Sequence, residues 1–288
     1  MAEIIKGADV KASLIEQMKK KMEETGVTPQ LAIVRVGANE SDLSYEKGVT
    51  KTCETIGINI KKVELPEDIC QADFEEGFRK VNDDPEVHGI LLFRPLPKTL
   101  DEKPIIDMID PDKDMDCMSM VNWAKLAMGD ESGYFPCTAE AVIKICEYAG
   151  VDFNGANAVV IGRSLVIGRP VGYMLIPRNA TVTFCHSKTK DISERCRNAD
   201  ILISATGKAG LVGEEYAKYV NPDCIAIDVG INFVDGKMCG DFAFDEVEKH
   251  VAKITPVPGG VGAVTNTVMC SHVVRAAIKA KTGQIVNF

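Results

Sequence analysis

Short apolar runs along the chain alternate with longer segments in which apolar residues recur at helical spacing. Such runs are typical of buried parallel strands, and the longer segments are typical of the helices that connect them. In the first half of the chain we expect strands at 31–36, 59–65 and 89–93, and helices at 8–24, 41–56 and 72–82. The pattern therefore predicts the α/β fold class.

A second series of the same kind follows, in the order of a Rossmann-type nucleotide-binding domain. It has an expected helix at 139–148 and expected strands at 157–161, 180–184, 201–204 and 224–228. Residues 95–136, rich in proline and aspartate, contain the expected domain boundary. We expect one domain over 1–120, joined by a C-terminal helix within 266–288, and a dinucleotide-binding domain over 121–265.

The composition and net charge of the chain indicate which classes of binding partner to expect. The 288 residues are 45% hydrophobic and 26% charged, which is ordinary for a globular protein of about two domains. The net charge of −9 comes without a basic block, so we expect neither a nucleic acid nor an anionic membrane as partner. No apolar run approaches the roughly 20 residues of a membrane span, and the start of the chain lacks signal-peptide order. Ten cysteines stand singly, without a Cys-x-x-Cys pair. We expect a cytoplasmic protein without a metal site.

A glycine turn in the second domain is the first candidate binding site. The expected strand 157–161 runs into Gly162-Arg163-Ser164, and a helix begins near Gly168. Such a turn points backbone N–H groups and a helix N-terminus at an anion, as in the binding of a dinucleotide pyrophosphate. The glycine spacing departs from Gly-x-Gly-x-x-Gly, so a turn without a ligand is equally consistent with this segment.

The residues that follow the expected strand 180–184 help to distinguish NAD from NADP as cofactor. An acidic side chain there would favour NAD, whereas 185–189 reads Cys-His-Ser-Lys-Thr. Arg163 and Ser187, with Lys188 as a further candidate, are suited to a 2′-phosphate because guanidinium and hydroxyl groups donate to phosphate oxygens. We therefore expect NADP, with NAD as the alternative. His186 is expected to be structural.

Three later loops are also expected to approach a ligand. They follow strands or are too rich in glycine and proline to form regular structure. The residues singled out in them are Thr206 and Gly207 in 205–207, Ile231 in 228–232, and Pro258, Gly259, Gly260 and Thr265 in 255–265.

Two segments of the first domain carry candidate chemistry. Tyr45 and Val49 share one face of the helix 41–56, while Lys47 and Lys51 point elsewhere. Residues 110–116 form a dense cluster of aspartates without calcium-loop spacing. We expect most of these aspartates to be solvated, with one of them available to bind a polar edge of a substrate.

These segments, in this order, resemble the bifunctional methylenetetrahydrofolate dehydrogenase/cyclohydrolase family over nearly the whole chain. The resemblance implies an N-terminal folate-binding domain, a Rossmann domain, a cleft between them and a homodimer. It also implies oxidation of 5,10-methylenetetrahydrofolate by hydride transfer to NADP, followed by hydrolysis to 10-formyltetrahydrofolate. The segments that show this resemblance are residues 89–92, 95–97, 110–116, 136–138, 162–164, 180–189, 228–232 and 255–262.

The resemblance also implies roles for individual residues. Tyr45 matches the tyrosine that stacks on the folate, and Asp116 matches the carboxylate that binds the pterin edge. Two positions depart from the family pattern: Val49 stands where the family has its cyclohydrolase lysine, and Phe93 stands where it has a partner glutamine. Catalytic or folate-binding contacts are further implied for Pro258, Gly259 and Gly260, and cofactor contacts for Gly162, Arg163, Ser164, Ser187, Thr206, Gly207, Ile231 and Thr265.

The sequence thus predicts an NADP-dependent dehydrogenase with weak or absent cyclohydrolase activity. Hydride transfer depends mainly on geometry, whereas hydrolysis needs groups that handle protons. A fully bifunctional enzyme that uses Lys47, Lys51 or another group is the first alternative. A non-catalytic folate- or nucleotide-binding protein is the second, and the intact turn at 162–164 argues against it.

Overall fold

The computed structural model describes residues 1–288, and its contacts divide the chain into two compact units. Unit 1 comprises residues 1–12 and 138–265, and unit 2 comprises residues 13–137 and 266–288. Both contain a parallel sheet with helices, which confirms the α/β fold class. No helix is long and apolar enough to cross a membrane.

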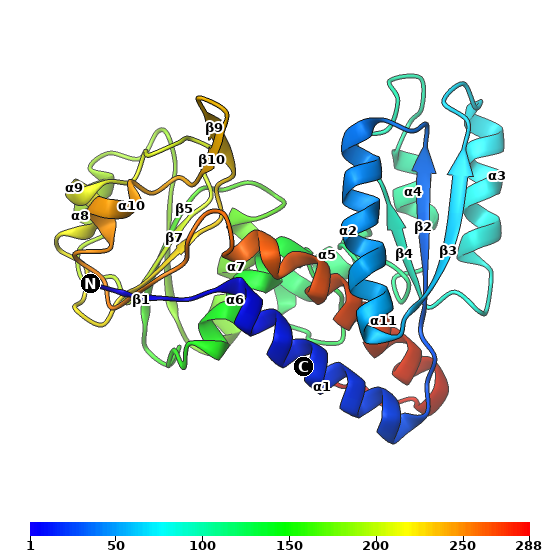
Figure 1. Cartoon of the computed structure of the whole chain (residues 1–288), viewed down its shortest axis with the longest axis horizontal. Coiled ribbons are helices and arrows are strands. Elements are labelled where there is room, and N and C mark those ends of the chain that lie inside the picture. Colours follow the sequence, from blue (N-terminus) through cyan, green and yellow to red (C-terminus); the bar gives the residue numbers. More distant parts are fainter. The chain divides into compact units, whose positions relative to one another are not determined.

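Unit 2 is built on a three-stranded parallel sheet. Its strand order is β3 (Asn59–Leu65), β2 (Gln30–Val36) and β4 (Gly89–Leu92). Leu31 of β2 is in register with Ile60 and with Gly89. Figure 1 shows the helices around these strands. They are α2 (Glu40–Ile56), α3 (Gln71–Asn82) and α4 (Lys103–Met108), while α5 (Met120–Met128) follows farther along the chain.

Strands β2 and β4 of the unit 2 sheet are buried on both faces, whereas the edge strand β3 is partly exposed. On one face, Ala32 and Val34 of β2 pack in a core with Phe74, Phe78 and Ile105 of α3 and α4. The last long helix, α11 (Thr265–Thr282), packs in the same unit against α2, where the sulfurs of Cys53 and Cys270 lie 3.6 Å apart. Burial on both sides explains why β2 is an apolar run apart from Gln30 at its start and Arg35.

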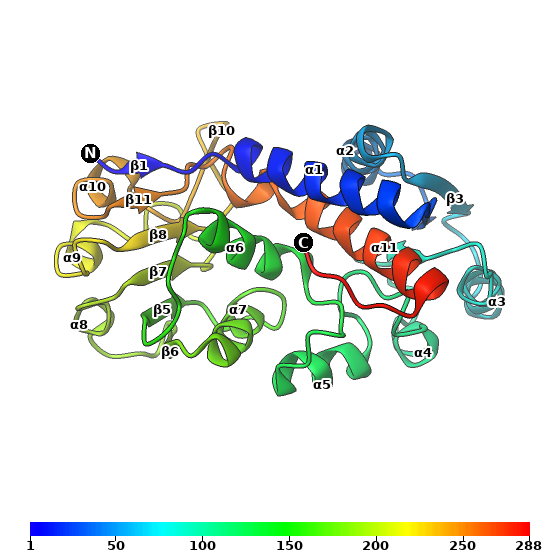
Figure 2. The same ribbon diagram turned by 90° about the horizontal axis from the view of Figure 1, so that it is seen from below.

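Unit 1 contains a six-stranded parallel sheet of Rossmann type. Figure 2 shows its strands side by side in the order β1, β11, β8, β7, β5 and β6. Their bounds are Glu3–Ile4, Lys253–Ile254, Ile225–Asp228, Ile201–Ser204, Asn157–Ile161 and Thr181–Cys185. Its helices are α6 (Cys137–Tyr148), α7 (Gly168–Leu175), α8 (Ile192–Arg195), α9 (Glu214–Ala217) and α10 (Phe244–Val247).

Several short elements of unit 1 were not expected from the sequence. Strands β1 and β11 have two residues each, too few to show a periodicity, yet their pairing places the first residues of the chain in the Rossmann sheet. A two-stranded hairpin of β9 (Asn232–Val234) and β10 (Lys237–Cys239) also forms. Non-local hydrogen bonding decides β1 and β11, whereas the hairpin is a local pairing closed by Asp235 and Gly236, both with positive φ.

Candidate functional site

The glycine turn after β5 is preformed in unit 1. Gly162 has φ 137°, and a Cβ atom there would lie 2.5 Å from the carbonyl oxygen of Ala205. Only glycine allows this approach. The hydroxyl of Ser164 accepts hydrogen bonds from the N–H groups of Ile167 and Gly168, at 3.0 and 3.3 Å. Arg163 is exposed on this turn, with its guanidinium free to meet an anion.

Strand register places Ser187 at the same sheet edge as Arg163. Ile161 pairs with Cys185, so each candidate lies two residues beyond a paired position on neighbouring parallel strands. Both side chains are exposed. His186, by contrast, closes its own turn, because its Nδ1 accepts a hydrogen bond of 3.1 Å from the N–H of Lys188.

A buried carboxylate that the sequence analysis did not single out organises the loop after β7. Asp241 is fully buried, and its Oδ2 accepts hydrogen bonds from the Ser204 hydroxyl and the Thr206 N–H, at 2.9 and 2.6 Å. Its Oδ1 accepts from the N–H of Lys208 at 2.9 Å. Burial by itself would raise the pKa of Asp241, but these donors outweigh it and hold the pKa below its ordinary value.

A cavity of about 310 Å³ lies beside the carboxyl end of β8. Ligands of open parallel sheets bind at this edge. Four predicted site residues, Ile231, Pro258, Gly259 and Gly260, are among those that line it. Thr265 begins α11 just beyond this loop, and its hydroxyl donates to the carbonyl of Val261 at 3.3 Å.

In unit 2, the candidate residues on α2 differ in exposure. The side chain of Tyr45 is 42% exposed, whereas Val49, one turn later, is fully buried. Phe93, at the end of β4, is also buried, and its ring centroid lies 5.3 Å from that of Tyr45. Partial burial, with the Cys137 thiol and the Asp116 carboxylate nearby, raises the pKa of Tyr45 above its ordinary value. The phenol is therefore neutral at pH 7.

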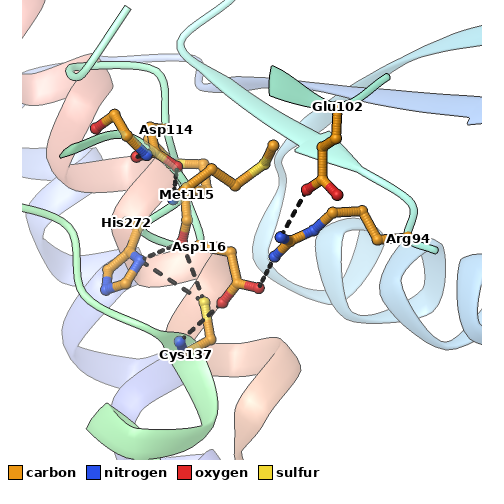
Figure 3. A network of polar contacts seen from close by, with 9 residues as sticks. Arg94, Glu102, Asp114, Met115, Asp116, Cys137 and His272 are labelled. Atoms are coloured by element: carbon orange, nitrogen blue, oxygen red, sulfur yellow. Dashed lines mark hydrogen bonds and ion pairs between the residues drawn. The ribbon is translucent and has the colours of Figure 1, made fainter. Parts of the chain in front are cut away.

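Asp116 is held by a network from three parts of the chain (Figure 3). Its Oδ1 accepts a hydrogen bond of 2.9 Å from the N–H of Cys137. The preceding carbonyl, that of Met115, accepts from the Cys137 thiol at 3.1 Å and from Nδ1 of the buried His272 at 2.8 Å. Because a carbonyl only accepts, His272 carries its proton on Nδ1 in this arrangement. The carboxylate of Asp116 remains 36% exposed.

The expectation of solvated aspartates around Asp116 is wrong for Asp114. That residue is fully buried, and its carboxylate accepts from the N–H groups of Met118 and Ser119 and from the side chain of Asn122. These donors replace its water, so Asp114 fixes the loop before α5. Asp112 is half exposed and pairs with Lys279 at 2.6 Å.

Three residues that organise the candidate sites were not singled out from the sequence: Asp241, His272 and Arg94. Asp241 and His272 bind segments distant in the sequence, whereas Arg94 lies between Phe93 and the segment 95–97, and its two carboxylate neighbours are set by the fold. Arg94 forms an ion pair with Glu102 at 2.9 Å and faces Asp116 at 3.9 Å.

Comparison with known families gives two matches in chain order. The model of the tetrahydrofolate dehydrogenase/cyclohydrolase catalytic domain matches residues 5–116, and the model of the NAD(P)-binding domain of the same family matches residues 136–281. The chain belongs to the tetrahydrofolate dehydrogenase/cyclohydrolase family. The match to the NAD(P)-binding domain covers the main part of unit 1, residues 138–265, and continues into α11 of unit 2.

Relatives of this family match nearly the full length. The bifunctional protein FolD of Alkaliphilus oremlandii is 46% identical over 280 residues, which cover 96% of this chain and 97% of that protein. The FolD of Clostridioides difficile is 46% identical over 278 residues, which cover 95% of this chain and 96% of that protein.

Solved structures of the family also match nearly the full length, at lower identity. The bifunctional FolD of Campylobacter jejuni has a TM-score of 0.89 at 37% identity, covering 96% of this chain and 99% of its own. The Trypanosoma brucei enzyme, in a complex with NADP and an inhibitor, has a TM-score of 0.85 at 32% identity, with coverage of 96% and 97%.

Proposed function

We propose that this chain oxidises 5,10-methylenetetrahydrofolate to 5,10-methenyltetrahydrofolate with NADP as hydride acceptor, and that its cyclohydrolase activity is weak or absent. Membership of the family supports the dehydrogenase reaction. One observation carries the second part: Val49 and Phe93 are both buried apolar side chains beside Tyr45, at the two positions where the family resemblance implies a lysine and a glutamine.

The residues of unit 1 fit a dinucleotide with a 2′-phosphate. The preformed turn at Gly162 presents backbone N–H groups to the pyrophosphate, and the exposed Arg163 and Ser187 supply donors to the extra phosphate. No acid at the end of β6 repels that phosphate. The loops of Thr206 and Ile231 lie farther along the same edge and position the nicotinamide end. Bound NADP supplies the acceptor for the hydride.

The residues of unit 2 fit a reduced pterin. The neutral, partly exposed ring of Tyr45 offers a stacking surface, and Phe93 supports that ring from behind. The Asp116 carboxylate, anchored through Cys137, accepts hydrogen bonds from the pterin amino and ring N–H groups. Pro258, Gly259 and Gly260 shape the cavity loop of unit 1 and are assigned to the folate side of the reaction.

Hydrolysis of the methenyl bridge requires a group that moves protons near that bridge. Val49 presents methyl groups and Phe93 a phenyl ring, and neither transfers a proton. The nearest lysines on α2, Lys47 and Lys51, are exposed, while Val49 is buried. They lie about 200° around the helix from Val49, so they point away from its face.

A full bifunctional activity is the alternative, and the relatives at 46% identity are named as bifunctional proteins. One preparation assayed for both reactions decides between the two. We expect formation of the reduced cofactor with methylenetetrahydrofolate, faster with NADP than with NAD, and accumulation of the methenyl compound. Its decay in the presence of the protein should match its decay in buffer. Rapid decay establishes bifunctionality, and absence of cofactor reduction establishes a non-catalytic binding protein.

The family resemblance further implies a homodimer, and the ten cysteines without a Cys-x-x-Cys pair favour the cytoplasm. We propose both for this chain. Light scattering of the purified protein at several concentrations tests the dimer, and a mass of one chain throughout would contradict it.

A further inference from the structure

Arg94 lies between two carboxylates in unit 2 (Figure 3). Its Nη1 donates a hydrogen bond of 2.9 Å to Glu102, and its Nη2 lies 3.9 Å from Oδ2 of Asp116. The second distance is too long for a hydrogen bond, so Asp116 does not accept from Nη2, which lies close beside its carboxylate. Arg94 and Asp116 are each 36% exposed.

We infer that Arg94 is a specificity-determining residue that recognises a carbonyl oxygen on the substrate heterocycle, next to the N–H groups bound by Asp116. This inference rests on the proposed folate function and specifies the carbonyl oxygen as the substrate feature that the site recognises. A carboxylate only accepts hydrogen bonds and a guanidinium only donates them. Side by side, they select a ring edge on which N–H donors stand next to a carbonyl acceptor.

The pterin ring of a folate has such an edge. Its 2-amino group and N3–H are adjacent donors, and the oxo group at C4 follows directly. A carboxylate paired with the two donors leaves the C4 oxygen beside it, where a guanidinium nitrogen about 4 Å from the carboxylate oxygen can donate. The observed separation of 3.9 Å suits simultaneous binding, and direct contact between the two charges would close this space.

Glu102 keeps the guanidinium in this position. It takes one donor of Arg94 at 2.9 Å and balances the positive charge, while the N–H of Cys137 holds Oδ1 of Asp116. Both charged groups are thus fixed before a ligand arrives, which reduces the entropic cost of binding.

The test compares the binding of tetrahydrofolate and its 4-amino analogue, measured by calorimetry. The analogue has a donor in place of the C4 oxygen, so Arg94 cannot bind it in the same way. For Arg94→Leu we expect affinity for tetrahydrofolate to fall about ten- to hundredfold, the size of one charge-assisted hydrogen bond. Affinity for the analogue should change little, so the preference for the 4-oxo compound falls by the same factor.

Three further variants sharpen the result. Arg94→Lys keeps a charge and a donor and should retain part of the preference, and Glu102→Gln, which weakens the anchor, should give an intermediate value. Arg79→Leu removes an exposed arginine of α3 and should leave the preference unchanged. Thermal unfolding of each variant confirms that it is folded.

The contrary outcomes are distinct. If Arg94→Leu and Arg94→Lys weaken both compounds equally, Arg94 only holds the loop and the inference is overturned. An unchanged affinity for both compounds overturns it as well. If the unaltered protein binds neither compound, the proposed folate function fails, and this inference fails with it.

Discussion

The ring of Phe93 packs against the ring of Tyr45, with the ring planes inclined by 49°. The contact joins the end of β4 to the first half of α2 and buries Phe93 almost completely, while one side of Tyr45 stays exposed. A polar side chain at position 93 would have to leave this apolar contact or bring water into it. Phe93 therefore adds an apolar ring beside the stacking surface of Tyr45 and brings no group for proton transfer.

Restoring the family's side chains should restore hydrolysis. In the double variant Val49→Lys with Phe93→Gln, the long lysine side chain can run along Tyr45 with its ammonium in water. We expect methenyltetrahydrofolate to decay faster than in buffer, by about 10²–10⁴-fold, the usual contribution of acid–base assistance. Absorbance of the methenyl compound measures this decay.

If the unaltered protein already hydrolyses that compound as fast as it forms, the interpretation of these two positions is wrong. Lys47→Ala and Lys51→Ala then show which ammonium is responsible, since each variant removes one of the two exposed lysines of α2.

Replacing the proposed folate anchor should separate folate binding from cofactor binding. Asp116→Ala removes a partly exposed carboxylate, so we expect folate affinity to weaken by about 1.5–3 kcal/mol and NADP affinity to stay constant. Calorimetry with each ligand measures both. Asp112→Ala is the matched control, because Asp112 lies in the same segment but pairs with Lys279. Unaltered folate affinity of Asp116→Ala would reject the role.

The choice of NADP over NAD should depend on Arg163. Arg163→Ala removes an exposed guanidinium next to the turn at Gly162, so the KM for NADP should rise by the equivalent of about 1.5–3 kcal/mol. The KM for NAD, which lacks the 2′-phosphate, should change far less. Arg197→Ala, which removes an exposed arginine paired with Glu194 in the same unit, serves as control. Equal effects on both cofactors, or a wild-type preference for NAD, would contradict the assignment.

Asp241 should be needed for the cofactor loop. Asp241→Asn turns an acceptor of several buried N–H groups into a group with one acceptor oxygen, so unfolding free energy should fall on the order of 2–3 kcal/mol and NADP should bind more weakly. Asp200→Asn is the control, since Asp200 accepts from Asn157 and Asn221 at the other edge of the sheet. A similar loss of NADP affinity in both variants would show a general effect of destabilisation.

Glu46 should make stability depend on pH at the acidic end. Burial favours a higher pKa for this carboxyl, but hydrogen bonds from Lys62 and Arg35 outweigh it and hold the pKa below its ordinary value of 4.5. Its stabilising contribution is therefore complete above pH 4.5 and is lost as pH falls through the lowered pKa. The difference in unfolding free energy between wild type and Glu46→Gln should shrink over that range. A constant difference down to pH 3 would refute this sign.

The parallel α/β architecture and most of the long helices and strands are predictable from the pattern of apolar residues. Apolar runs such as those of β2 and β5 indicate strands that are buried on both faces of a sheet. The helical spacing of apolar residues is likewise visible within a short stretch of sequence. The predicted cofactor residues also follow from local order, because parallel strands end at one edge. Knowing that Arg163 and Ser187 each follow a strand is enough to expect them there.

The hydrogen-bond partners that hold the polar side chains of the candidate sites could not be predicted from the sequence, because they depend on the tertiary structure. Asp114 and Asp116 stand two residues apart in one acidic run, yet one is fully buried by loop donors and the other stays partly open beside Arg94. The N-terminal strand β1 forms only because it pairs with β11, some 250 residues later in the chain. His272 and Asp241 likewise act on segments distant in the sequence. Local sequence patterns indicate whether a side chain is buried. The group that donates a hydrogen bond to a buried oxygen, however, depends on which distant segment packs against that oxygen.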